Sequence, residues 1–137
     1  MTRGVFIDSG AFIAFLDASD RSHADVDACF AEPPKRWCTS LLVVSETYSW
    51  FLHRLGEDDA RAFRALLVRL PGLQLLDVDR SHHAAVQNKL EEHRGRKLTY
   101  VDASSLVFVR HRKVGAVWGT DSDLAIEGAK VVPGPPP

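Results

Sequence analysis

Short apolar runs of strand length recur along the chain, and longer stretches with a different apolar spacing separate them. Strands are expected over 3–8, 36–38, 73–78, 115–119 and 130–132. The first run ends on a carboxylate, Asp8, and the fourth is followed directly by Thr120 and Asp121. Short strands that alternate with longer amphipathic stretches are typical of an α/β protein.

The stretches between these runs carry apolar residues three and four positions apart, which predicts helices with one buried face. Helices are expected over 9–16, 22–30, 41–55, 58–70, 81–93 and 99–112, with a helical turn over 121–127. Side chains able to cap a helix stand before several of them. Asp20 or Ser22 is expected to cap the second helix, Thr39 or Ser40 the third, Asp58 or Asp59 the fourth, and Asp79 or Ser81 the fifth.

This order predicts a central parallel sheet flanked by helices on both faces, because parallel strands need crossover connections and helices supply them. The chain of 137 residues has the length of a single domain. We expect that domain to span 1–132 and the proline-rich stretch 133–137 to be a disordered tail. In such sheets ligands bind beyond the carboxyl ends of the strands, so candidate chemistry is sought there.

Composition narrows the class of protein further. With 45% hydrophobic and 26% charged residues, the chain is close to an average soluble domain. No apolar run approaches the roughly 18 residues of a membrane span, and no signal peptide is recognisable, so a cytoplasmic protein with no membrane partner is expected. The two cysteines, Cys29 and Cys38, lack zinc-ligand spacing and are interpreted as buried apolar residues.

Carboxylates interrupt apolar sequence at several separate places. Asp8 follows the first strand, Glu46 lies within an apolar helix, Asp102 precedes an apolar run, and Asp121 and Asp123 follow the fourth strand. Burying an unpaired carboxylate costs several kcal/mol, so an acid in such a setting needs a cation, a hydrogen-bond donor or a proton. The sequence must therefore offer these side chains a partner.

Each acid also has a purely structural interpretation. Asp8 could cap the first helix, although the adjacent Ser9 could do so equally well. Asp102 fits a capping box with Thr99, and Asp121 and Asp123 fit turn and helix-start positions. Glu46 is harder to explain in this way, because bulky side chains occupy most of its helix circumference.

Taken together, the acids favour a divalent cation. Strand ends and helix starts converge on one edge of an α/β sheet, and acids gathered there repel one another unless a cation neutralises them. Ligands that are all oxygen atoms select Mg²⁺ or Mn²⁺ over zinc. Such an ion can bind a phosphate oxygen and activate a water molecule for attack on phosphorus, which is phosphodiester hydrolysis.

At this point the residues resemble a known family. Four motifs carry the resemblance in order: Asp8-Ser9, Thr39-Ser40-(x)5-Glu46, Tyr100-x-Asp102-Ala103 and Thr120-Asp121-x-Asp123. They are similar to those of the PIN domain, in particular the VapC-like toxin ribonucleases of type II toxin-antitoxin pairs. The similarity covers essentially the whole chain, and it implies an endoribonuclease that depends on one or two Mg²⁺ or Mn²⁺ ions.

The resemblance also implies roles for individual residues. Asp8, Glu46, Asp102 and Asp121 would be the catalytic acids and metal ligands, and Asp123 would be a further or water-mediated ligand; Ser9 and Thr120 would supply hydroxyls near the metal. Two positions depart from the family pattern. Gly10 stands where a second small polar residue is common, and Leu124 replaces the usual phenylalanine.

Basic residues suggest where RNA would be held. Outside the five acids the chain carries 17 basic and 13 acidic residues, a difference of +4. Arg94, Arg96 and Lys97 are candidate phosphate contacts. The cluster 110–113 is another candidate, although it also suits the negative end of a helix. The pair His82-His83, on a predicted basic helix, is interpreted as surface. The resemblance further implies an antitoxin partner and a homodimer.

Other functions remain open at this stage. A haloacid-dehalogenase-like phosphatase also begins with an aspartate after a strand, but its chemistry needs a second acid where this chain has Gly10. A PIN nuclease that processes RNA without an antitoxin is a further alternative. So is a catalytically silent RNA-binding module of the same fold, although the presence of all four principal acids disfavours it.

Overall fold

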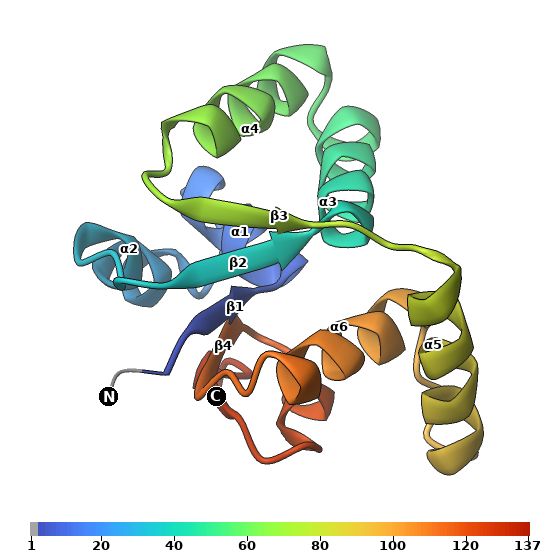
Figure 1. Cartoon of the computed structure of the whole chain (residues 1–137). Coiled ribbons are helices and arrows are strands. Elements are labelled where there is room, and N and C mark those ends of the chain that lie inside the picture. The colour runs from blue at the N-terminus through green and yellow to red at the C-terminus, as the bar shows by residue number, and fades with distance from the viewer. Residues whose placement is uncertain (1–2) are drawn as a thin grey trace.

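The computed structural model describes residues 3–137 and contains a five-stranded sheet whose strands are all parallel (Figure 1). The strands are β1 (Val5–Ile7), β2 (Trp37–Ser40), β3 (Leu73–Leu76), β4 (Ala116–Gly119) and β5 (Lys130–Pro133). Their order across the sheet is β3-β2-β1-β4-β5, so the first strand of the chain is the central one. The predicted α/β class with a parallel sheet is confirmed.

Six α-helices and one 3₁₀ helix connect and follow the strands. They are α1 (Ser9–Leu16), α2 (His23–Ala31), α3 (Leu41–Arg54), α4 (Glu57–Arg69), α5 (Arg80–Glu92), α6 (Tyr100–His111) and η1 (Ser122–Ala125). Each predicted helix is present within a few residues of its expected bounds. Ser40 caps α3 as expected, since its Oγ atom accepts a hydrogen bond from the Val43 amide at 3.1 Å.

The prediction for the start of α4 was wrong. This helix begins at Glu57, after Gly56 with a φ of 106°, so Asp58 and Asp59 lie inside its first turn instead of capping it. Glycine adopts this φ without a steric penalty, and the acids of the first turn suit the positive end of the helix dipole. The preceding helix, α3, ends at Arg54, and the conformational freedom of Gly56 allows α4 to begin directly after this glycine.

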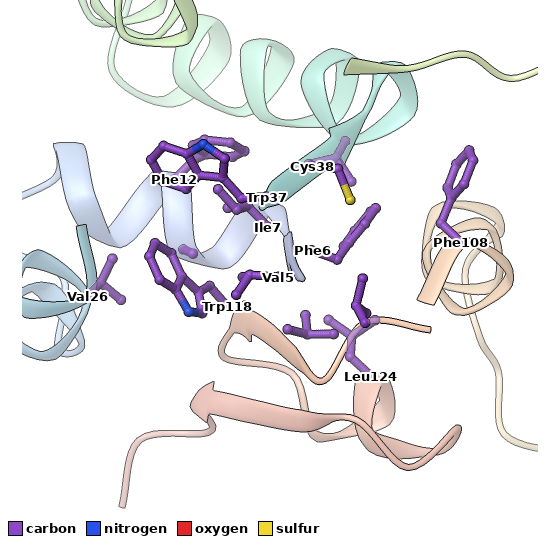
Figure 2. Close-up of a cluster of buried hydrophobic side chains, with 14 of the residues drawn as sticks. Val5, Phe6, Ile7, Phe12, Val26, Trp37, Cys38, Phe108, Trp118 and Leu124 are labelled. Carbon is purple, nitrogen blue, oxygen red and sulfur yellow. The ribbon is translucent and has the colours of Figure 1, made fainter. Parts of the chain in front are cut away.

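The side chains of the central strands alternate between two apolar layers (Figure 2). On one face Trp37 and Trp118 pack edge to face with ring centroids 5.9 Å apart, and Phe30 of α2 lies 5.1 Å from Trp118. On the other face Phe6 stacks with Phe108 of α6 at 6.2 Å. Helices therefore cover both faces of the sheet, as predicted.

The aromatic residues of α3 and α4 are divided between core and surface. Phe51 and Phe63 are buried and stack with centroids 5.8 Å apart. Trp50 is partly exposed, with the Arg54 guanidinium 5.6 Å from its ring centroid, and Leu55 is 45% exposed. Most of this aromatic bulk belongs to the core, and a smaller part remains accessible at the surface.

The pair His82-His83, interpreted from the sequence as surface residues, divides between two environments. His83 is exposed and contacts the Tyr100 hydroxyl at 2.6 Å. His82 is buried instead, stacks on Phe108 with centroids 4.1 Å apart, and bonds through Nε2 to the Ser104 Oγ atom at 2.6 Å. A polar core contact between α5 and α6 thus replaces the expected surface position.

The last strand, β5, extends one residue further than expected. Pro133 pairs with Gly119 in the β4–β5 register, and the amide of Gly134 donates to the Gly119 carbonyl at 3.1 Å. The sheet therefore extends beyond the boundary expected after Val132. Among the described residues, no helix is both long and apolar enough to cross a membrane.

Candidate active site

Four separate segments bring acidic side chains to the carboxyl edge of the sheet. Asp8 follows β1, and its amide donates to the Trp118 carbonyl of β4 at 2.9 Å. By the alternation along β1, the Asp8 side chain continues on the face of Phe6, which is the face covered by α6. Asp102 lies in the first turn of α6, which also contacts α3 and η1. The topology thus brings the predicted acids to one edge.

The buried member of this group is Asp8, which is 5% exposed. Its Oδ1 atom is buried and has no hydrogen-bond partner among the described residues. Burial raises the pKa of this carboxyl to about 7, the Ser9 amide offsets part of the rise, and the charges of Asp102, Glu46 and Asp121 raise it further. Asp8 occupies the N-cap position of α1, but its side chain makes no capping bond, so the capping interpretation is not supported.

Two other acids share this electrostatic environment. Partial burial of the carboxyl group raises the pKa of Glu46, and the charge of Asp102 raises it further, although the side chain as a whole is exposed. Burial also raises the pKa of Asp102, Thr99 lowers it by hydrogen bonding, and Asp121 and Asp123 raise it. The Asp102 charge acts on Asp8 and Glu46, and the Asp121 charge acts on Asp8 and Asp102, as expected for carboxylates that share one region.

Asp102 and Asp121 have structural roles as well. The Asp102 amide donates to the Thr99 Oγ1 atom at 3.0 Å, as the capping box predicted. Asp121 caps η1, because its Oδ1 atom accepts from the Asp123 amide at 2.9 Å. The capping interpretations are therefore confirmed, and the role of both residues as metal ligands stays a prediction. These local hydrogen bonds fix the backbone that carries Asp102 and Asp121, and the charges of these two side chains act on the other carboxylates.

The candidate hydroxyl residues lie in the same region. Ser9 is the first residue of α1, next to Asp8, and Thr120 joins β4 to Asp121. Both are partly buried. Gly119 also lies against Asp8, since a Cβ atom on this glycine would stand 3.2 Å from the Asp8 Cβ atom. The end of β4 is therefore packed closely against the start of α1.

These residues fit a divalent cation. Across residues 3–137, no lysine, arginine or histidine lies within 4.0 Å of a carboxylate oxygen of Asp8, Glu46, Asp102, Asp121 or Asp123. The group combines an unpartnered buried oxygen with several repelling charges and offers only oxygen ligands. Carboxylate oxygens are the ligands that Mg²⁺ and Mn²⁺ prefer.

A second cluster of potential ligands, which the sequence did not reveal, does not fit a metal. Glu92, His93 and Glu127 bring ligand atoms within 4.8 Å of one another. However, the Lys89 ammonium group bonds to both carboxylates, at 3.2 Å to Glu92 and closer still to Glu127. Arg110 adds a further positive charge 3.6 Å from Glu127. Protein cations therefore already neutralise this cluster, which links α5 to the segment before β5.

The candidate RNA contacts lie on the loop between α5 and α6. Arg94, Arg96 and Lys97 are all exposed, and the Arg94 guanidinium lies 3.2 Å from Glu91 on the surface. Lys97 has a φ of 58°, a left-handed conformation that is uncommon for a residue other than glycine. The loop leads directly into the first turn of α6, which carries Asp102. Its positive charges therefore precede Asp102 by five to eight residues in the sequence.

Fold and site together define an α/β protein with a cluster of carboxylates at the carboxyl edge of a parallel sheet. The sequence profile of the PIN domain matches residues 5–127. This span covers most of the chain, and the chain belongs to the PIN domain family. The resemblance that the four motifs suggested is confirmed.

Individual relatives agree with this assignment. The chain is 25% identical over 130 residues to a Mycobacterium tuberculosis protein named 23S rRNA-specific endonuclease VapC20, covering 90% of this chain and 94% of the relative. The crystal structure of that VapC20, described as a Sarcin-Ricin loop cleaving toxin, matches with a TM-score of 0.84 at 24% identity, over 91% of this chain and 95% of the other.

Two further crystal structures share the fold at lower similarity. PAE2754 from Pyrobaculum aerophilum matches with a TM-score of 0.64 at 23% identity, covering 96% of this chain and 92% of that one. FitAcB from Neisseria gonorrhoeae matches with a TM-score of 0.62 at 15% identity, covering 93% and 95%. The shared fold thus extends over almost the full length of each chain.

Proposed function

We propose that this protein is a metal-dependent endoribonuclease that acts as the toxin of a toxin-antitoxin pair. The observation that carries the proposal is the buried Asp8 carboxyl, whose Oδ1 atom has no partner and whose pKa is raised to about 7 among three other acids. A carboxylate in this position is stabilised by a bound cation, and membership of the PIN domain family supports a nuclease.

In this proposal Asp8, Glu46, Asp102 and Asp121 hold one or two Mg²⁺ or Mn²⁺ ions, and Asp123 ligates directly or through water. When bound, the ion supplies the positive charge that positions a phosphate and makes a water molecule a better nucleophile. Ser9 and Thr120 offer hydroxyl groups that can bind substrate oxygens or water at the same edge. The hydrogen bonds at Thr99 and within η1 hold Asp102 and Asp121 in place before substrate arrives.

The proposed substrate is a folded ribosomal RNA. The support is the relative named as a 23S rRNA-specific endonuclease, which aligns over 90% of this chain. A ribosomal substrate would place the activity in the cytoplasm.

The proposed partners follow the same relatives. An antitoxin would keep the toxin inactive, and a positively charged side chain inserted among the carboxylates would neutralise them as a metal does. A homodimer is proposed as well, in keeping with the resemblance to VapC-like toxins, and the exposed apolar side chains of Leu41, Leu55, Leu75 and Val68 are candidates for its interface.

The test is cleavage of structured and unstructured RNA by purified protein in Mg²⁺, Mn²⁺ or EDTA. We expect cleavage by the wild type in either metal, and loss of cleavage in EDTA and in Asp8→Asn. Asp58→Asn, at an exposed position in α4, is a matched control that should cleave normally. Cleavage that persists in both EDTA and Asp8→Asn would reject the proposed mechanism.

The toxin assignment needs a separate measurement. Induced expression of the wild type should arrest growth of a bacterial host, and co-expression of the protein encoded beside it should relieve the arrest. RNA cleavage without growth arrest would favour the alternative of a processing nuclease that has no antitoxin. Metal-independent RNA binding without cleavage would favour the silent module.

A further inference from the structure

A second feature lies at the opposite edge of the sheet from the carboxylates. A groove with a volume of about 1120 Å³ is lined by residues at or just before the start of every strand. Val5, Trp37, Gly72, Gly115 and Ala129 mark these five starts. Because all strands are parallel, the groove occupies the amino edge, whereas Asp8 and Asp121 occupy the carboxyl edge.

The groove concentrates positive charge. Its lining contains six cationic side chains and a single acid, in a chain whose formal net charge is −1. The cations are Arg3, Lys35, Arg36, Arg110, Arg112 and Lys113. The acid, Glu127, is already bonded to Lys89 and lies 3.6 Å from Arg110. The groove is thus strongly positive even after this ion pair is counted.

Backbone pairing brings these distant segments together. The Val5 amide donates to the Arg36 carbonyl at 3.0 Å, and the Gly115 amide donates to the Gly4 carbonyl at 3.0 Å. The aliphatic part of the Arg3 side chain packs against Gly115, since a Cβ atom on that glycine would lie 3.0 Å from the Arg3 Cβ atom. The sheet itself therefore assembles the basic lining, which no single stretch of sequence contains.

Most of these cations are available to a ligand. Arg3, Lys35, Arg36 and Lys113 are exposed, and within residues 3–137 none of them lies within 4.0 Å of a carboxylate oxygen. Arg112 donates a hydrogen bond to the neutral Gln74 amide oxygen at 3.1 Å. Unpaired charges of one sign in a groove repel one another, and a polyanion relieves that repulsion.

We propose that this basic groove binds the phosphate backbone of RNA, as a second RNA-binding site apart from the carboxylates. Arginine supplies four of the six cations, and its guanidinium group matches phosphate geometry with paired hydrogen bonds. The choice of RNA rests on the proposed function, because an acidic cleavage edge repels its own substrate and needs positive charge elsewhere to retain it.

The test measures RNA binding in EDTA, so that no cleavage is required. The groove variant is the triple substitution Lys35→Glu, Arg36→Glu and Lys113→Glu. The matched control makes the same change in charge on exposed α4 with Arg61→Glu, Arg64→Glu and Arg69→Glu. Thermal melting checks that both variants fold. The probes are a fluorescent structured hairpin RNA, a short single-stranded RNA and a fluorescent poly-glutamate peptide, each measured over a range of salt concentrations.

We expect the groove variant to bind the hairpin at least tenfold more weakly, and the slope of log affinity against log salt to become shallower by about 2–3, as loss of three phosphate contacts requires. The α4 control should bind like the wild type. Because the groove contacts phosphates, the short single-stranded RNA should also lose affinity in the groove variant. An unchanged hairpin affinity or an equal loss in the α4 control would each overturn the proposal. Wild-type binding to poly-glutamate that exceeds binding to RNA would overturn it in favour of an acidic protein partner.

The binding assay tests the basic groove and the cleavage assay tests the nuclease, so either proposal can be rejected without the other. Metal-dependent cleavage that disappears in Asp8→Asn, together with unchanged RNA affinity of the groove variant, rejects the groove and retains the nuclease. RNA binding that depends on the groove, in a protein that cleaves no RNA under any metal, retains the groove and rejects the nuclease.

Discussion

Gly10 and Thr120 approach so closely that no side chain fits between them: a Cβ atom on Gly10 would lie 2.6 Å from the Thr120 Oγ1 atom and 3.3 Å from its backbone nitrogen. Gly10 is the second residue of α1, and Thr120 joins β4 to Asp121. Gly10 stands where the family pattern has a second small polar residue. Its lack of a side chain lets the start of α1 pack directly against the end of β4.

We predict that Gly10→Ala lowers the free energy of unfolding by about 1–3 kcal/mol, the usual range for overpacking a well-filled interior. RNA cleavage should fall as well, because Thr120 and the adjacent Asp121 must shift. Chemical denaturation measures the first effect and cleavage assays the second. Adding Thr120→Ala should recover part of the lost stability. Gly4→Ala, whose added Cβ would meet atoms no closer than 3.4 Å, should change stability little.

Stability of the metal-free protein should fall as pH rises, because of Asp8. Its pKa is about 7 in the folded state against an ordinary value of 3.8, so the folded protein holds a proton that the unfolded chain releases between these values. The stabilisation is complete below pH 3.8 and is lost as pH rises through about 7, at a total of roughly 4 kcal/mol. Urea denaturation in EDTA at pH 5 and pH 8 measures the loss. Asp8→Asn should show a smaller loss than Asp58→Asn, and equal losses would contradict the prediction.

Divalent metal should stabilise the wild type. A ligand that binds only the folded state adds stability as its concentration exceeds its dissociation constant, by about 2.7 kcal/mol at a hundredfold excess. We expect Mg²⁺ or Mn²⁺ to raise the Tm of the wild type and of Asp58→Asn, and EDTA to reverse the rise. Asp8→Asn and Asp102→Asn should respond much less. An equal rise in all four proteins would indicate binding outside the predicted acids.

The basic loop before α6 is expected to contact RNA. Charge reversal of Arg94, Arg96 and Lys97 should weaken RNA binding at low salt and leave the stabilisation by Mg²⁺ unchanged, because these side chains are exposed. Electrophoretic mobility shift and thermal melting measure the two quantities. Unchanged RNA affinity would mean that these charges do not contact RNA and only form part of the solvated surface of the loop between α5 and α6.

The contact between His82 and Ser104 should contribute to stability. Ser104→Ala removes a 2.6 Å hydrogen bond to a buried imidazole, which we expect to cost about 1–3 kcal/mol. His83→Ala, at the exposed neighbour, should cost less. Burial lowers the pKa of His82 below its ordinary 6.5, so its contribution is present above pH 6.5 and is lost as pH falls below it. A pH series of denaturation curves, with His82→Phe as the non-titrating variant, checks the direction.

The sequence predicted the order of elements and the acidic edge well, because both depend on local signals. Strand-length apolar runs, helical spacing and capping residues such as Ser40 and Asp79 are read over a few positions. Asp8 and Asp121 could be placed at one edge because parallel strands share their direction. The two interpretations of Asp102 could not be separated from sequence; the structure confirms the capping bond with Thr99, and the role as a metal ligand stays a prediction.

Features that depend on distant partners could not be predicted. His82 looked like a surface residue on a basic helix, and only the packing of α5 against α6 buries it between Ser104 and Phe108. The burial of Lys89 between two carboxylates has the same origin. The basic groove joins the segments at Arg3, Lys35–Arg36 and 110–113, which only the sheet brings together.

The central position of β1 also bears on the order in which the site can assemble. Asp8 follows β1, whereas Asp121 follows β4, which lies far along the 137-residue sequence. Until β4 inserts beside β1, the carboxylates stay on separate stretches of the polypeptide. A partly folded chain that lacks this pairing therefore cannot gather them.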